Sequence, residues 1–396
     1  MAGEERGSAA GEEEPLVGVE RAWPVLLRLM GVLGFVLPRR RSSGHYEIAY
    51  VRLIPMVGIT AVIGWHSLTF PKKFTDVAYD VFMDILSYIT GFAHVVYAFA
   101  VALHRRRETC RFFESLDGTL KPARTWVSCA AFLFFSLFVA FFLGLNYNIA
   151  DWTNISSLHW ICFTLIMSLL PAFLDLYLMI LINAVARRYR GLVRLLPSGR
   201  RSWTSPGDSG ASVGDARALR GPSIAISRRP NPLQDLGDLS SVASILSRCQ
   251  ELTDLVQLYN QIFSDLLLLS CGSFLAKMMN SSYYLAINVH IRIYDSVIYS
   301  VSEVGRFYLL CRQADSLKEA HSTLEDALLA LHQRRDTPPE DRDSLLSQLV
   351  HLKSRPAHIA IGSVGVLGSD VLVTCVNVAL TYTAIVFQYR PSEGGN

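Results

Sequence analysis

Apolar runs that are long enough to cross a lipid bilayer recur along this sequence. A helix rises 1.5 Å per residue, so about 20 apolar residues cross the ~30 Å hydrocarbon core of a membrane. Hydrophobic residues make up 51% of the chain, which is too apolar a composition for an ordinary soluble protein. We therefore predict an all-α membrane protein, because a helix satisfies its backbone polar groups within one segment.

The apolar runs predict seven transmembrane helices, near 48–68, 78–103, 126–147, 160–186, 262–289, 294–311 and from 358 onward. The predicted regions are a cytosolic tail with an interfacial helix (1–47), transmembrane helices 1–4 (48–186), a disordered cytosolic loop (187–244), a cytosolic helix that leads into transmembrane helices 5–6 (245–311), cytosolic anchor helices (312–357), and transmembrane helix 7 with a pore segment (358–396). Glycine and serine gather at 362–369, which indicates a break that splits the last helix near 368–370.

The first anchor helix is predicted from its amphipathic pattern. One face carries leucines and the other carries charged residues, which is typical of a helix that packs on a core. The leucines are Leu317, Leu324, Leu328 and Leu331.

Arginine is concentrated before the first crossing and after the second, fourth and sixth. Because positively charged loops stay in the cytosol, we expect a cytosolic N-terminus and an outside C-terminus. The acidic first residues do not match the basic start of a cleavable signal peptide. Asn154, in Asn154-Ile155-Ser156, is a candidate glycosylation acceptor in a predicted outside loop.

The seven cysteines include no Cys-x-x-Cys pair, and several of them lie inside apolar runs. They are expected to be small buried hydrophobic residues rather than a disulfide framework or a metal site. We therefore predict no metal, no cofactor and no nucleic-acid partner.

The last hydrophobic run has one mildly polar helical face. Steps of three and four residues place these side chains in one stripe: Thr374, Val378, Thr381, Ile385 and Gln388. Such a face suits a water-lined path better than it suits lipid. It also suits contact between transmembrane helices, because threonine and asparagine side chains join helices there. The spacing alone leaves both interpretations open.

The end of this run carries a short motif. Thr381-Tyr382, five further residues and Gln388-Tyr389 resemble the terminal signature of insect-type gustatory receptors, which ends in phenylalanine. Tyr389 stands in place of that phenylalanine, a conservative replacement that keeps the aromatic ring and adds a hydroxyl group. Thr383 stands where sugar-sensing members tend to carry glutamate, which argues against a sugar receptor. The chain is similar to this family along nearly its whole length.

The resemblance implies a ligand-gated, non-selective cation channel in the plasma membrane of sensory neurons. It further implies a homo- or hetero-tetramer of related receptors, surrounded by membrane lipid, with one last helix per subunit around a central pore. The pore and gate would then lie at Thr381, Ile385, Gln388 and Tyr389. Four apolar or aromatic side chains that converge on an axis exclude water and so block ions. Tyr389 is alternatively an interfacial aromatic anchor beside Arg390.

A ligand pocket is expected among the outer halves of crossings two to six. Aromatic faces with a few polar groups suit a small, partly apolar tastant. The candidates are Asp84, Tyr88, Phe141, Asn146, Trp160, Thr164, Tyr283, Tyr284, Asp295 and Tyr299. Packing or interfacial anchoring is the alternative role of each of these side chains.

Two charged residues lie well inside predicted crossings, Asp175 in the fourth and Lys277 in the fifth. Charges inside a membrane are costly and therefore mark functional positions. Their similar depth allows them to pair across adjacent helices, although a water-filled vestibule or snorkelling accommodates each alone. His94 in the second crossing is expected to be a hydrogen-bonded core histidine.

Three other protein classes fit less well. A G-protein-coupled receptor has the opposite orientation. An intramembrane aspartyl protease needs two neighbouring carboxylates that share a proton, whereas Asp295 and Asp370 are predicted at opposite depths and Ser369 replaces the glycine of the protease motif. The chain is thus not expected to be an enzyme. A secondary transporter is the main alternative function, although no internal repeat is visible.

Overall fold

The computed structural model describes residues 31, 38–40, 46–52, 54–55, 57–61, 78–116, 155–196, 242–286, 293–335 and 337–388, and helices dominate it. The long helices are α4 (Ala78–His104), α7 (Ile155–Leu195), α8 (Val242–Ala286), α9 (Ile293–His332) and α11 (Ser369–Gln388). The shorter elements are β1 (Pro38–Arg40), β2 (Tyr46–Ile48), a 3-10 turn η1 (Tyr50–Arg52), α5 (Arg106–Leu116), α10 (Pro339–Ser354), β3 (Ala360–Ile361) and β4 (Gly365–Val366). The helical class predicted from the sequence is confirmed.

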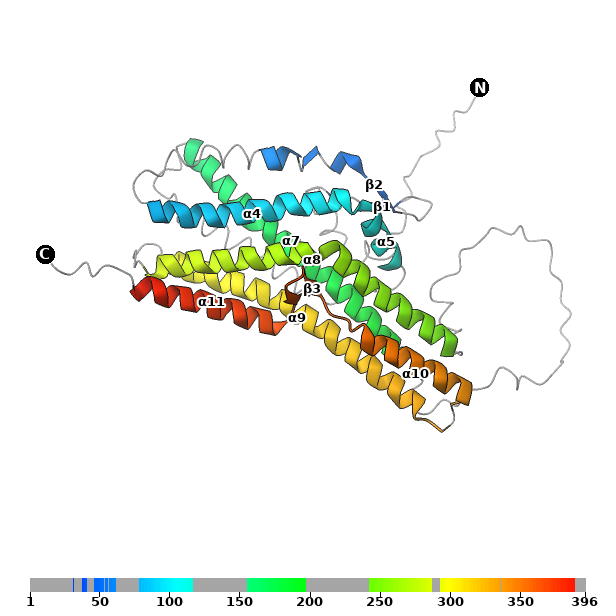
Figure 1. Cartoon of the computed structure of the whole chain (residues 1–396). Coiled ribbons are helices and arrows are strands. Elements are labelled where there is room, and N and C mark those ends of the chain that lie inside the picture. Colours follow the sequence, from blue (N-terminus) through cyan, green and yellow to red (C-terminus); the bar gives the residue numbers. More distant parts are fainter. Residues whose placement is uncertain are drawn as a thin grey trace, which may run out of the picture.

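Helices α7, α8 and α9 form the centre of the molecule (Figure 1). α7 packs along α9, and α8 contacts both of them. α4 lies along α8, α11 lies against α8 and α9, and α10 packs back along α9. Segments that are far apart in the sequence therefore lie side by side in one elongated bundle.

All three central helices, α7, α8 and α9, are much longer than a membrane crossing. α8 has 45 residues, which corresponds to about 68 Å, against ~30 Å for a hydrocarbon core. It includes both 245–261 and residues 262–286 of the fifth predicted crossing, so the expected direct connection between them is confirmed. α9 likewise continues through 311–312, where the sequence placed the end of the sixth crossing. A single continuous helix, α9, therefore takes the place of the predicted sixth crossing and the first predicted anchor helix.

Two described helical stretches, Leu170–Leu195 and Val242–Tyr283, are long and apolar enough to cross a membrane. Ile89–His104 and Ser369–Ile385 are shorter apolar helices. The predicted third crossing at 126–147 and residues 62–68 of the predicted first crossing lie outside the described residues. The first crossing does not begin as a helix at 48, because 46–48 form β2 and 50–52 form η1. The loop predicted at 187–244 is too long at both ends, since α7 continues to Leu195 and α8 begins at Val242, and 197–241 lie outside the described residues.

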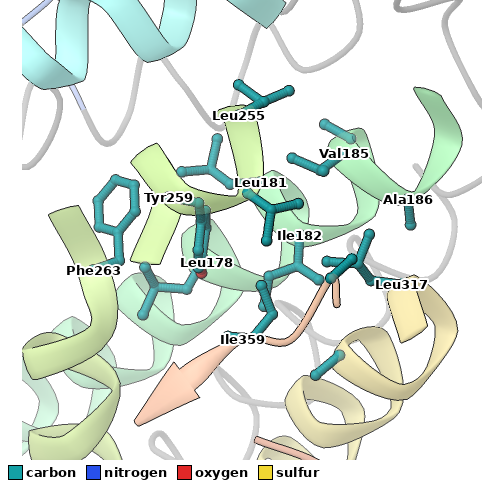
Figure 2. Close-up of a cluster of buried hydrophobic side chains, with 14 of the residues drawn as sticks. Leu178, Leu181, Ile182, Val185, Ala186, Leu255, Tyr259, Phe263, Leu317 and Ile359 are labelled. Carbon is teal, nitrogen blue, oxygen red and sulfur yellow. The ribbon is translucent and has the colours of Figure 1, made fainter. Parts of the chain in front are cut away.

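The core at the centre of the bundle is built by helical periodicity. Leu178, Leu181, Ile182 and Val185 recur on one face of α7 and are at most 2% exposed. Figure 2 shows them meeting α8 side chains, including Tyr259, with further apolar side chains from α9 and from the segment before β3. The predicted leucine face of the first anchor helix is also buried, since Leu317, Leu324, Leu328 and Leu331 are at most 3% exposed.

A small β-hairpin precedes α11, where the sequence predicted the first half of a split helix. β3 pairs with β4 in antiparallel register, Ala360 opposite Val366 and Ile361 opposite Gly365. The turn between the strands contains Gly362 at φ 51°, a left-handed backbone conformation that glycine adopts without strain. The expected break near 368–370 is present, but the segment before it is extended rather than helical.

The hairpin is bound to α8 by backbone and side-chain hydrogen bonds. Asn260 Nδ2 donates to the His358 carbonyl at 2.7 Å, and the Ala360 N–H donates to Asn260 Oδ1 at 2.9 Å. The Gly362 N–H donates to the Ser264 carbonyl at 2.9 Å. The start of α11 is therefore fixed to the middle of α8.

Candidate functional site

Four charged side chains from three helices meet inside the bundle. Asp175 on α7, Lys277 on α8, and Glu303 and Arg306 on α9 are between 2% and 6% exposed. Arg306 Nη1 lies 3.1 Å from Asp175 Oδ2, and Lys277 Nζ donates to Glu303 Oε1 at 3.2 Å. Arg306 Nη2 also donates to Glu303, one turn away on the same helix. We call the series Asp175–Arg306–Glu303–Lys277 the charge chain.

The charge chain alternates in sign, so each buried charge has an opposite charge beside it. An isolated buried charge is strongly unfavourable, and close ion pairs with further hydrogen bonds offset that penalty. Ser270 Oγ supplies one such bond, donating to Asp175 Oδ1 at 2.5 Å. Because the charge chain connects α7, α8 and α9, it fixes their positions along one another.

The sequence singled out Asp175 and Lys277, and both belong to the charge chain. Within the described part of the chain, however, each forms its ion pair with a different residue of α9. The physical reason is that α7 packs mainly along α9 and less along α8. Glu303 and Arg306 escaped sequence-based prediction, although opposite charges one turn apart within an apolar run are a recognisable signal.

His94 on α4 lies beside the charge chain. It is 0% exposed and within electrostatic range of Arg306, Lys277 and Glu303. Neither of its ring nitrogens has a hydrogen-bond partner among the residues that the structure describes. The predicted core position of His94 is therefore confirmed, but no described residue forms the predicted hydrogen bond with its ring.

Two of the candidate pocket residues have described side chains. Tyr299 lies one helical turn before Glu303 on α9, is half-buried and is within electrostatic range of Arg306. Tyr283 on α8 is 7% exposed. Tyr299 and Glu303 therefore lie on the same face of α9, one turn apart, so this predicted pocket residue adjoins the charge chain.

The other candidate residues are placed only in part. Helix backbone is described, but side chains are not, at Asp84, Tyr88, Trp160, Thr164, Tyr284 and Asp295. Outside the described residues lie Phe141, Asn146, Asn154 and Tyr389. The pocket and the glycosylation site accordingly stay predictions.

The predicted polar stripe of the last run faces away from the other helices. Its members are all exposed, Val378 to 45% and Ile385 to 46%: Thr374, Val378, Thr381, Ile385 and Gln388. The opposite face of α11 packs on the bundle through Cys375, 6% exposed, and Ala379, 1% exposed. We call the exposed set the outer stripe.

The hydroxyl groups of the outer stripe are satisfied by their own helix. Thr374 Oγ1 donates to the Asp370 carbonyl and Thr381 Oγ1 to the Asn377 carbonyl, both at 2.8 Å. Within the described part of the chain, neither threonine forms a hydrogen bond with another element. The outer stripe is thus available to water or to another molecule.

The first turn of α11 is attached to α9. The Ser369 N–H donates to Asp315 Oδ2 at 3.1 Å, and Ser369 Oγ also donates to this oxygen. A carboxylate at a helix N-terminus satisfies a free backbone N–H and complements the helix dipole. Asp315 therefore fixes where α11 begins.

The protease alternative conflicts with this attachment. Asp295 and Asp315 are about 20 residues apart along α9, which corresponds to about 30 Å. Asp370 directly follows Ser369, which is bound to Asp315. Asp295 and Asp370 are thus too distant to share a proton. The described residues also contain no group of three or more metal-ligating side chains.

Two solved structures with a similar fold are those of an olfactory receptor. The chain is similar to the insect olfactory receptor OR5 from Machilis hrabei in complex with eugenol, at 12% identity and a TM-score of 0.65, over 92% of this chain and 96% of that chain. It is similar to the same receptor in a second structure, at 12% identity and a TM-score of 0.65, over 93% of this chain and 98% of that chain. At this identity the similarity establishes the fold alone.

A comparison with curated proteins found no significant match. The family model described as 7tm Chemosensory receptor matches residues 21–356, which is most of the chain. The matched range includes the charge chain and ends before α11. The chain therefore belongs to the 7tm chemosensory receptor family, whose members are membrane-embedded receptors and not enzymes.

Proposed function

We propose that this chain is a gustatory receptor that acts as a ligand-gated, non-selective cation channel for small-molecule tastants. Its place would be the plasma membrane of sensory neurons, with the N-terminus in the cytosol. The observation that carries the proposal is the outer stripe, a mildly polar face of a membrane-length helix that the chain itself leaves uncovered.

Four copies of the chain around an axis would turn this face into a pore lining. Thr381, Ile385 and Gln388 would line the path, and Tyr389 beside Gln388 would contribute to the gate. Ile385 is 46% exposed in the single chain, so a ring of four such side chains can form a dewetted constriction. A small rotation of α11 would exchange that ring for the more polar Thr381 and Gln388 and would rehydrate the path.

Exposed apolar side chains on the anchor helices support the tetramer. Leu329 on α9 is 42% exposed, and Leu346 and Val350 on α10 are 49% and 62% exposed. In a region predicted to lie in the cytosol, such residues suit contact with another subunit. We therefore propose that subunits, identical or from related receptors, meet through 312–357.

The ligand pocket would lie among the outer ends of α4, α7, α8 and α9. The solved olfactory receptor of this fold holds eugenol, which supports a small, partly apolar ligand for this chain. Tyr283 and Tyr299 are the pocket residues with described side chains, and Tyr299 adjoins the charge chain. Ligand contact at Tyr299 could thus be transmitted to the packing of α7, α8 and α9.

The test is electrical recording from cells that express the chain alone and with related subunits, during application of a tastant panel. We expect ligand-evoked cation currents, and we expect Gln388→Ala and Tyr389→Ala to change basal current or ion permeability without loss of surface protein. Leu380→Ala is the matched control, because Leu380 is 60% exposed on α11 but lies off the outer stripe. Tracer uptake without single-channel currents would favour a transporter, and responses confined to volatile odorants would make it an olfactory receptor.

A further inference from the structure

Two free cysteines on neighbouring helices face each other where the packed face of α11 meets α8. Cys271 Sγ on α8 lies 3.6 Å from Cys375 Sγ on α11. Cys375 is 6% exposed, whereas Cys271 is half-buried. The contact lies in the interface that holds α11 on α8.

We propose that Cys271 and Cys375 form a hydroperoxide-sensitive dithiol, which closes into a disulfide and clamps α11 onto α8. The sulfur–sulfur contact shows that the two side chains already point toward each other. Bond formation requires the sulfurs to approach by about 1.5 Å, which side-chain rotation with a small helix shift can provide.

The two thiols supply both electrons for this reaction. The sulfur of Cys271, the more accessible of the pair, attacks the O–O bond of a hydroperoxide. An S–O bond forms, the O–O bond breaks, and the departing oxygen takes the thiol proton to become an alcohol or water. Cys375 then attacks this sulfenic sulfur, so an S–S bond forms, the S–O bond breaks, and hydroxide leaves with the Cys375 proton as water. Two thiols are oxidised and one hydroperoxide is reduced.

The location of the pair favours small oxidants that enter membranes. Cys271 lies within the predicted fifth crossing and Cys375 near the start of α11, and both segments are apolar. Organic hydroperoxides partition into such an environment, whereas hydrogen peroxide reaches it from water. The shared chemistry is the O–O bond, and the two sources are separated by using one oxidant of each kind.

The other described cysteines, Cys110, Cys249 and Cys311, form no sulfur–sulfur contact of this kind with a described residue. Burial raises the pKa of Cys249 in the cytosolic part of α8 to about 12, which keeps this thiol protonated and unreactive. Cys311 on α9 is 0% exposed and lies within electrostatic range of Cys375. Cys311 is therefore the one described alternative partner that an experiment must distinguish.

A disulfide here would restrict the proposed gate. The outer stripe changes its orientation only if α11 moves relative to α8, and a covalent bond between these helices opposes that movement. This functional consequence rests on the proposed channel function, whereas the sulfur chemistry does not.

The test uses the full chain in cell membranes, treated with tert-butyl hydroperoxide or with hydrogen peroxide. After free thiols are blocked under denaturing conditions, digestion and mass spectrometry should detect a Cys271–Cys375 linked peptide that dithiothreitol removes. We expect this peptide in wild type and in Cys311→Ser, and not in Cys271→Ser or Cys375→Ser. A link through Cys311, or no link while half-buried Cys110 becomes oxidised, would overturn the proposal.

Currents then test the clamp separately. We expect oxidation to abolish most of the ligand-evoked current in wild type and to leave Cys375→Ser unaffected, with recovery after dithiothreitol. An unchanged current despite complete cross-linking would refute the clamp. No current before oxidation, together with a correct linked peptide, would instead contradict the proposed channel function and leave the thiol chemistry supported.

Discussion

The charge chain and the outer stripe are two polar regions of one helical bundle, and they are arranged in opposite ways. The charge chain contains fully charged groups from α7, α8 and α9, and these groups find their partners inside the same chain. The outer stripe contains hydroxyl, aliphatic and amide groups of α11, and all of its members stay exposed. The charged groups are thus enclosed within the bundle, whereas the uncharged polar groups of α11 are exposed on its surface.

The difference follows from the free energy of burying each kind of group. A charge inside a bundle must be paired, because an unpaired one is strongly destabilising. A threonine hydroxyl can donate to the carbonyl one turn earlier, as Thr374 and Thr381 do, and then needs no other partner. The charge chain is therefore suited to holding helices in register, and the outer stripe to meeting water or another subunit.

The largest effect is expected from breaking the charge chain at Arg306. Arg306→Met leaves both Asp175 and Glu303 without their shared cation, whereas Lys277→Met leaves Glu303 paired with Arg306. We expect Arg306→Met to destabilise the fold by about 3–5 kcal/mol, and Lys277→Met to destabilise it clearly less. Thermal unfolding of purified protein in detergent and the amount at the cell surface measure the difference.

The informative result is which of these two variants loses more stability. If Lys277→Met were as damaging as Arg306→Met, the centre of the charge chain would not be Arg306. A double variant, Asp175→Asn with Arg306→Met, removes the charge that Arg306→Met leaves unpaired, because Glu303 stays paired with Lys277. It should recover part of the stability that Arg306→Met loses, because the cost arises from uncompensated charge.

An intermediate effect is expected where α11 is joined to the bundle. Gly362 has φ 51°, and a Cβ there would lie 3.0 Å from Leu268 Cδ2. Gly362→Ala should cost about 1–2 kcal/mol, because non-glycine residues are strained in left-handed backbone. Gly365→Ala is the matched control, since it lies in the same hairpin with no atom within 4 Å of the added Cβ.

Thermal unfolding again provides the measurement, and limited proteolysis reports on the hairpin itself. Gly362→Ala should expose the segment before α11 to cleavage, whereas Gly365→Ala should not. Equal behaviour of the two variants would mean that the hairpin does not hold α11 in the way its contacts with α8 indicate.

The positions of the helices could be predicted from the sequence better than which helices pack against one another. Apolar length and the leucine pattern of 312–333 depend on residues close together in the chain, and both agree with the structure. The partners of Asp175 depend on which helices pack together, and α7 packs mainly along α9, which follows much later in the sequence. Spacing along one helix does not contain that information.

The hairpin illustrates a second limit. Glycines and serines at 362–369 indicate a break, but they fit a split helix as well as a tight turn. The choice is made by tertiary contacts, because Asn260 on α8 bonds to both His358 and Ala360. The outer stripe, in contrast, was predicted residue by residue, since helical periodicity alone decides which side chains share a face.

The smallest effect on stability is expected on the outer stripe itself, and this expectation completes the comparison with the charge chain. Thr381→Val removes a hydroxyl that is exposed and bonded only to its own helix, so the free energy of unfolding should change by less than about 0.5 kcal/mol. Ala379→Leu, on the packed face of the same helix where Ala379 is 1% exposed, should be clearly more destabilising because it overfills the interface. In recordings the order should reverse, with Thr381→Val altering ion permeation although its stability is unchanged. A strongly destabilised Thr381→Val would show that the outer stripe packs within its own subunit, and the contrast between enclosed charge and exposed polarity would then fail.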